Sequence, residues 1–119
     1  MKKSIKLLEQ GFESSSTKTP EFKHFARIFR NEFTKEMQTV GATNITFSVG
    51  HFYISGFFTI GKQAWYFSLP DVRGSKYRMP QLMYREARDY KDYTGGANRW
   101  VDIKPLMADQ MCWYFKVID

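Results

Sequence analysis

The sequence predicts an α+β domain in which a long N-terminal helix is followed by an antiparallel sheet of three to four strands and a C-terminal helix. Apolar residues recur at helical spacing after Pro20, alternate with a period of two between residues 44 and 69, and return to helical spacing after residue 102. The chain has 119 residues, of which 43% are hydrophobic and 18% aromatic. This size fits a single domain with an aromatic core, which we expect over residues 19–119.

Residues 1–18 are expected to form a flexible N-terminal arm that precedes this domain. The segment 11–18 contains three consecutive serines, is too polar to bury, and has too short an apolar period to hold a helix. We therefore place the start of regular structure at residue 19.

The long helix is expected to begin at Pro20 and to end before Gly41. Thr19 is a suitable N-cap, proline is favoured at the first helical position, and Glu21 places an acidic side chain in the first turn. A glycine after the last apolar position is a typical helix stop. The apolar residues step by three and four and so share one face: Phe22, Phe25, Ala26, Phe29, Phe33, Met37 and Val40.

Three strands are predicted by clean alternation, at residues 44–49, 51–60 and 63–69. The second should place Phe52, Ile54, Phe58 and Ile60 on one face. A fourth strand is predicted at residues 81–88, where Leu82, Met83 and Tyr84 are apolar without alternation, so a helix is the alternative there.

The remaining segments are predicted from composition and spacing. The basic segment 72–80 and the segment 89–99, which contains Gly95 and Gly96, are expected to be loops. Residues 102–118 are expected to form a buried helix, because Ile103, Met107 and Met111 lie at helical spacing. A closing strand over residues 112–118 is the alternative, since that stretch is aromatic and β-branched.

Several functional classes lack the residues that they need. The only histidines are His24 and His51, neither of which has a partner at metal-ligand spacing, and Cys112 is the only cysteine. No phosphate-binding glycine loop or nucleophile elbow is present. We therefore predict no enzyme, no catalytic residue, no metal and no cofactor. A nucleotide-handling enzyme would have to use the only local group of carboxylates, which we expect to be ion-paired with the many arginines of this stretch: Asp71, Glu86, Asp89 and Asp92.

No segment predicts contact with a membrane. No apolar run approaches the roughly 18 residues that cross a bilayer, and the first eight residues lack the apolar region of a signal peptide. A single cysteine is typical of a reducing compartment. We therefore expect a cytoplasmic protein. Its aromatic content favours a homodimer, but the composition is equally compatible with a monomer.

A basic and aromatic surface is expected between Arg73 and Lys104. The net charge of +6 favours an acidic partner, and this stretch holds eight basic residues against four acidic ones. Mixed cationic and aromatic surfaces suit unstacked bases and also protein interfaces. Lys23, Arg27 and Arg30 form a second basic stripe, which a solvated helix face explains equally well. The candidate binding residues are Arg73, Lys76, Arg78, Arg85, Arg88, Lys91, Tyr93, Arg99 and Trp100.

Two further features belong to this surface. The turn that contains Gly95, Gly96 and Asn98 could offer backbone N–H groups to a phosphate or carboxylate, and is a candidate anion site. If the long helix covers one face of the sheet, the other face carries Tyr53, Phe57 and Tyr66, as in sheet-type RNA binders. The competing expectation is that the C-terminal helix covers that face.

Three ordered blocks carry a resemblance to a known group of proteins. They are GHFYISGF at 50–57, YFSLPDVR at 66–73, and the segment 85–96 that ends in KDYTGG. This pattern resembles small open reading frames that are passengers of bacteriophages and other bacterial mobile elements. The resemblance implies a context: small proteins of such elements often disarm host nucleases or defence complexes, among them as anti-CRISPR proteins.

The function expected from these observations is that of a non-enzymatic phage or mobile-element protein that inhibits a host defence complex, most sharply an anti-CRISPR protein that binds an effector nuclease or its guide RNA. A mimic of DNA should be acidic, whereas this chain is basic, so direct mimicry is disfavoured. The alternative is a protein that binds single-stranded DNA or RNA directly. Salt dependence and nuclease treatment would separate the two.

Overall fold

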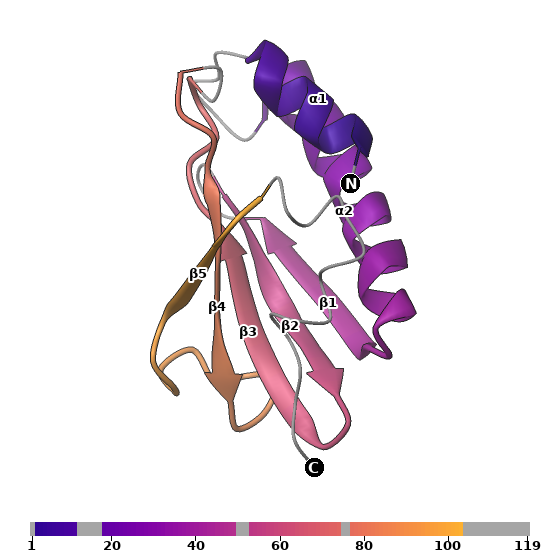
Figure 1. Cartoon of the computed structure of the whole chain (residues 1–119), viewed down its shortest axis with the longest axis vertical. Coiled ribbons are helices and arrows are strands. Elements are labelled where there is room, and N and C mark those ends of the chain that lie inside the picture. Colours follow the sequence, from indigo (N-terminus) through magenta and orange to yellow (C-terminus); the bar gives the residue numbers. More distant parts are fainter. Residues whose placement is uncertain (1, 12–17, 50–52, 75–76, 104–119) are drawn as a thin grey trace.

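The computed structural model describes residues 2–11, 18–49, 53–74 and 77–103. Two helices precede a five-stranded sheet (Figure 1). The elements are α1 (Lys2–Gln10), α2 (Pro20–Thr39), β1 (Thr43–Val49), β2 (Ile54–Ile60), β3 (Gln63–Leu69), β4 (Gln81–Ala87) and β5 (Arg99–Asp102).

The sheet is a meander in which each strand pairs with its neighbour in the sequence. The strand order is β1-β2-β3-β4-β5, and all four pairings are antiparallel. Both helices lie on the same side of the sheet (Figure 1). The two faces of the sheet therefore differ: one carries the helices, and we call the opposite one the far face.

The core lies between α2 and the sheet and is dominated by phenylalanine. Phe33 has no exposed surface, and its ring packs against Phe67 from β3 at a centroid distance of 4.6 Å. It also contacts Phe58 from β2 and Phe47 from β1 edge-on. The alternation predicted for residues 44–49, 51–60 and 63–69 places Phe47, Phe58 and Phe67 on the correct face, because side chains two apart on a strand face the same way.

Helix α1 was not expected, since residues 1–18 were predicted to be a flexible arm. That prediction is wrong for residues 2–10, where Ile5 and Leu8 are buried in the core. The Glu32 carboxylate of α2 accepts hydrogen bonds from the backbone N–H groups of Lys3 (3.2 Å) and Ser4 (2.9 Å). A side chain from a neighbouring helix thus supplies the N-terminal cap that the local sequence of α1 lacks.

An irregularity in β1 explains a glycine in the first resembling block. The register between β1 and β2 shifts between Thr43 and Thr46, and Asn44 has a positive φ of 52°. At this bulge the carbonyl of Thr46 comes so close to Gly56 that a Cβ on residue 56 would overlap it. Gly56 is therefore a packing requirement of the β1–β2 pair.

The predicted architecture needs three corrections. The long helix is α2, not the N-terminal element, because α1 precedes it. The sheet has five strands instead of three to four, since residues 99–102 of the predicted loop and tail pair with β4 as β5. No helix follows the sheet in the described residues; Asp102, the expected start of the C-terminal helix, ends a strand. Residues 104–119, where the rest of that prediction falls, lie outside the described part.

Candidate functional site

The far face of the sheet is organised in cross-strand rows. Its central row holds three large side chains next to one another, Phe57 on β2, Tyr66 on β3 and Arg85 on β4. The row beyond it, toward the start of β2, continues through Ser55, Ser68, Met83 and Trp100. The far face therefore carries aromatic rings and a guanidinium, whereas the opposite face carries the core.

The central row forms an aromatic cluster with Tyr93, which comes from the loop after β4. The Tyr93 ring packs edge-on against Phe57 (5.2 Å between centroids) and Tyr66 (5.8 Å). The Arg85 guanidinium carbon lies 4.5 Å from the Tyr66 ring centroid, in a cation–π contact. Phe57 is buried, but Tyr93 keeps 58% of its surface exposed. The cluster thus presents the Tyr93 ring to solvent, with the Phe57 and Tyr66 rings packed beneath it.

Arg85 also ties the loop to the sheet. Its guanidinium donates to the backbone carbonyl of Tyr93, and at 3.2 Å to the side-chain oxygen of Asn98. Both ends of the 93–98 segment are therefore held by one side chain from β4. Arg85 acts here by positioning the loop as well as by supplying charge.

Asp92 is the second anchor of this loop. Its buried carboxylate accepts hydrogen bonds from the backbone N–H of Arg88 (2.9 Å), from Arg88 Nε (3.2 Å), and from the N–H of Thr94 (3.1 Å). The backbone hydrogen bond from Arg88, its side-chain hydrogen bond and the one from Thr94 hold the pKa of Asp92 far below its usual range. The same contact raises the pKa of Arg88. Asp92 is therefore a structural carboxylate that closes the loop.

The turn predicted as an anion site lies next to this carboxylate. A Cβ on Gly95 would overlap the carboxylate of Asp92, and one on Gly96 would lie 2.5 Å from the backbone oxygen of Glu86. Gly96 also has a positive φ of 72°. The two glycines therefore allow close packing of the turn onto Asp92 and β4. Asn98, the third residue of the candidate anion site, is the acceptor for Arg85.

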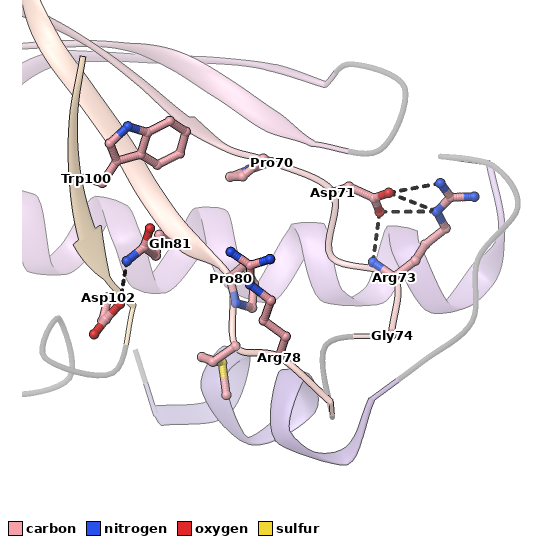
Figure 2. A pocket seen from close by; sticks show the side chains of 10 residues that line it. Pro70, Asp71, Arg73, Gly74, Arg78, Pro80, Gln81, Trp100 and Asp102 are labelled. Carbon is pink, nitrogen blue, oxygen red and sulfur yellow. Dashed lines mark hydrogen bonds and ion pairs between the residues drawn. The ribbon is translucent and has the colours of Figure 1, made fainter. Parts of the chain in front are cut away.

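Two of the predicted binding arginines, together with Trp100, line a hollow at one end of the far face. The hollow has a volume of about 390 Å³ and lies between the segment after β3, the start of β4, and β5 (Figure 2). Arg73 forms a bidentate ion pair with Asp71 on one wall. Arg78 and Trp100 belong to the same lining, and Trp100 keeps 53% of its surface exposed.

A second hollow, of about 600 Å³, lies at the other end of the far face and was missed by the sequence analysis. Its floor is the row of small side chains in which Thr59 pairs with Ala64. Lys62, from the turn between β2 and β3, lines it together with Tyr90 and Arg88 from the loop after β4. The exposed Tyr90 and the basic turn residue Lys62 were visible in the sequence, but only the pairing of β3 with β2 on one side and with β4 on the other brings them together.

The structure does not gather all of the predicted binding residues. Arg99 lies on the helix-bearing side of the sheet, where it contacts Glu86 at 3.4 Å and the Trp65 ring at 5.7 Å. Lys91 is exposed, with its ammonium group 5.3 Å from the Tyr90 ring centroid. Lys76 lies outside the described residues. The expectation that a C-terminal helix covers the far face also concerns residues outside them.

Three carboxylates in the described part of the chain form separate ion pairs with arginines. Asp71, Glu86 and Asp92 each pair with an arginine, namely Arg73, Arg99 and Arg88. Among residues 2–11, 18–49, 53–74 and 77–103, no group of three or more His, Cys, Asp or Glu side chains is placed to hold a metal ion. His24 contacts Arg27 on the exposed side of α2.

Comparisons of the chain with protein-family models, with curated proteins and with solved structures find no match. Within the described residues, neither helix has the length and apolar character that a membrane crossing requires. The fold and the site thus define an α+β protein with two helices on one face of an antiparallel five-stranded sheet. Its distinguishing feature is the aromatic and basic far face.

Proposed function

We propose that this protein is a non-enzymatic binding protein that holds single-stranded nucleic acid on the far face of its sheet. The observation that supports this most is the cluster of Tyr93, Tyr66 and Arg85. In it the exposed Tyr93 ring packs on the Tyr66 ring, which in turn contacts the Arg85 guanidinium. Bases that are not paired stack on such rings, and stacking accepts any base because each has a π-face.

The charges around the cluster are suited to the phosphate backbone. Arg88 exposes 82% of its side chain, and Lys91 and Lys62 are exposed at the same end of the far face. Exposed aromatic side chains accompany them along this face: Tyr90, Tyr93 and Trp100. Alternating cations and rings is the arrangement by which proteins follow a single strand. In a duplex the faces of the bases are already stacked on neighbouring base pairs, so they could not stack on these aromatic side chains.

The resemblance to proteins of mobile elements supports a biological setting for this activity. We propose that the strand is exposed RNA or DNA of a host defence complex in the bacterial cytoplasm, and that occupying it inhibits the complex. An anti-CRISPR protein that grips guide RNA is the sharpest form of this proposal. The net charge of +6 supports a contact with nucleic acid over a mimic of it.

Binding of labelled 15-nucleotide DNA and RNA, followed by fluorescence anisotropy, tests the activity. Single strands should bind more tightly than a duplex of the same length, and affinity should fall with added salt through counterion release. Tyr93→Ala should weaken binding about tenfold, because stacking of one base contributes roughly 1–3 kcal/mol. Tyr93→Phe keeps the ring and should bind like the wild-type protein.

Matched controls separate the far face from general charge. Lys91→Ala should lower affinity and reduce the salt dependence by roughly 0.7, the slope of one phosphate contact in a single strand. Lys23→Ala removes the same charge from the exposed side of α2 and should change neither. Equal losses for the two lysine variants, or no loss for Tyr93→Ala, would place binding elsewhere.

A second candidate function is inhibition through a protein surface. The same exposed Tyr93 and Trp100, with arginines nearby, have the composition of interface hot spots. Retention of a defined host complex from lysate after nuclease treatment would support this candidate. Loss of all retained material after nuclease treatment would leave the nucleic-acid binder.

A further inference from the structure

The hollow at the β3, β4 and β5 end of the far face combines three different chemical groups. Its volume of about 390 Å³ is within the range of roughly 300–1,000 Å³ typical of small-molecule sites. Trp100 supplies an exposed flat ring, Asp102 a carboxylate, and Arg78 a guanidinium. Figure 2 shows the indole ring and the Asp102 carboxylate on one side, with Arg78 pointing into the space between them and the Asp71–Arg73 pair.

The carboxylate in this hollow is held in place. Gln81 and Asp102 face each other across the β4–β5 pair, and Gln81 Nε2 donates to Asp102 Oδ1 at 2.8 Å. Trp100 and Asp102 are two residues apart on β5, so their side chains leave the sheet on the same face. The strand pairing therefore sets a ring and an oriented acceptor side by side.

The two arginines of the hollow differ in what they contact. Arg73 directs its guanidinium to Asp71, with Nη2 2.9 Å from Oδ2, so that the pair is close to neutral. Arg78 is exposed and makes no hydrogen bond or ion pair with the described part of the chain. Arg78 is therefore the cation available to an anionic ligand.

We propose that this hollow binds a guanine nucleotide. Trp100 stacks on the base, the Asp102 carboxylate accepts from its Watson–Crick edge, and Arg78 pairs with its phosphate. A carboxylate only accepts hydrogen bonds, and guanine is the common base whose edge offers two adjacent donors, N1–H and the N2 amino group. Adenine and cytosine each offer one amino group, and the ring nitrogen beside it is an acceptor. The lone pair of that nitrogen repels a carboxylate.

The nucleotide could be free or part of a strand, because the recognising chemistry is the same. If the ligand is one nucleotide of a bound strand, the inference rests on the function proposed above. If the ligand is a free nucleotide, the inference does not depend on that function. The experiment therefore includes both forms.

Calorimetric titration with GMP, AMP, CMP and UMP tests the base preference. GMP should bind at least about tenfold more tightly than AMP, the discrimination expected of one good bidentate contact. Asp102→Asn should abolish this preference and retain residual stacking. Asp89→Asn removes an exposed carboxylate at the other end of the sheet and should leave the preference intact. Equal affinity for all four nucleotides, or a preference that survives Asp102→Asn, would overturn the inference.

Two more variants assign the remaining groups. Trp100→Leu should weaken binding of all four nucleotides. Arg78→Ala should weaken binding of GMP and leave guanosine unaffected, because guanosine lacks the phosphate. A loss that is equal for GMP and guanosine would overturn the role of Arg78.

Oligonucleotides with a single guanine separate the two sources and the two proposals. If a decamer with one guanine binds more tightly than GMP, and this gain depends on Trp100, the hollow takes a nucleotide of a strand. If the decamer binds no more tightly than GMP, the hollow takes a free nucleotide. The proposed strand-binding function then fails, and the inference of a guanine site stands. If decamers bind through Tyr93 without any preference for guanine, the inference fails and the proposed function stands.

Discussion

The carboxylate of Asp92 accepts a hydrogen bond of 2.9 Å from the backbone N–H of Arg88, four residues earlier, and so closes the loop that carries Tyr93 onto the sheet. The same carboxylate accepts from the N–H of Thr94, on the other side of Tyr93. The buried Asp92 carboxylate therefore fixes the backbone before and after Tyr93, and so fixes the position of the exposed ring. The KDYTGG block is explained by this closure.

Replacing Asp92 by Asn should lower stability in a pH-dependent way. Because the folded protein lowers the pKa of Asp92, its stabilising effect is fully present above the unfolded pKa of about 3.9 and is lost as pH falls through the lower folded value. Urea unfolding of the wild-type protein and Asp92→Asn should thus show a constant difference above about pH 5, and this difference should begin to shrink only below about pH 4, as pH approaches the lower folded pKa. Asp89→Asn is the control; an equal difference at all pH values would contradict the charge argument.

Replacing Gly96 by Ala should destabilise the protein more than the same change at Gly41. Both glycines have positive φ, 72° and 87°, which costs an alanine about 1–2 kcal/mol. A Cβ on Gly41 meets nothing within 4 Å, whereas one on Gly96 would lie 2.5 Å from the Glu86 carbonyl oxygen. Thermal unfolding of the two variants isolates the cost of close packing. Equal losses would show that backbone conformation alone matters.

Replacing Phe33 by Ala should cost about 3–5 kcal/mol of unfolding free energy, the usual range for a large ring removed from a core. Phe33 is fully buried and meets rings from β1, β2 and β3. Lys35→Ala, at an exposed position of the same helix, should cost less than about 0.5 kcal/mol. A loss below about 1 kcal/mol for Phe33→Ala would contradict the packing of α2 described above.

Replacing Glu32 by Ala should release α1 from α2. The carboxylate caps the first turn of α1 through Lys3 and Ser4, and loss of a cap costs about 0.5–2 kcal/mol. Hydrogen exchange should become faster in residues 2–10 while the strands keep their protection. Lys6→Ala, on the exposed side of α1, should leave exchange unchanged. Unaltered protection in Glu32→Ala would show that burial of Ile5 and Leu8 alone holds the helix.

The elements with a long regular period were predictable from sequence. The Thr19 cap, Pro20 and the apolar stripe predict α2, and all of its buried residues belong to the stripe. Val40, the last residue of the predicted stripe, lies just beyond the helix as its C-cap and is partly buried. Alternation predicts which residues of β2 and β3 face the core, because the two sides of a strand differ in polarity. For residues 81–88 the strand prediction is confirmed over Gln81–Ala87. Met83 breaks the alternation because it is also buried, on the far face.

The elements that were missed depend on contacts between distant residues. Helix α1 has nine residues, too few to be stable alone, and owes its place to Glu32 and to burial of Ile5 and Leu8. Strand β5 has four residues and no alternation that stands out, and it forms because β4 offers an edge to pair with. The local sequence of α1 does not show the contact with Glu32, and that of β5 does not show its pairing with β4.

By itself, the sequence determined the identity of the core helix, the polarity of the central strands, the excess of positive charge and the presence of a basic and aromatic stretch. Only the tertiary structure decided how that stretch is divided. It places Arg85 and Tyr93 at one cluster, Arg78 and Trp100 at a hollow, and Arg99 on the opposite side of the sheet. The physical reason is that a change of one residue in strand register moves a side chain to the other face, and register depends on pairing across the sheet.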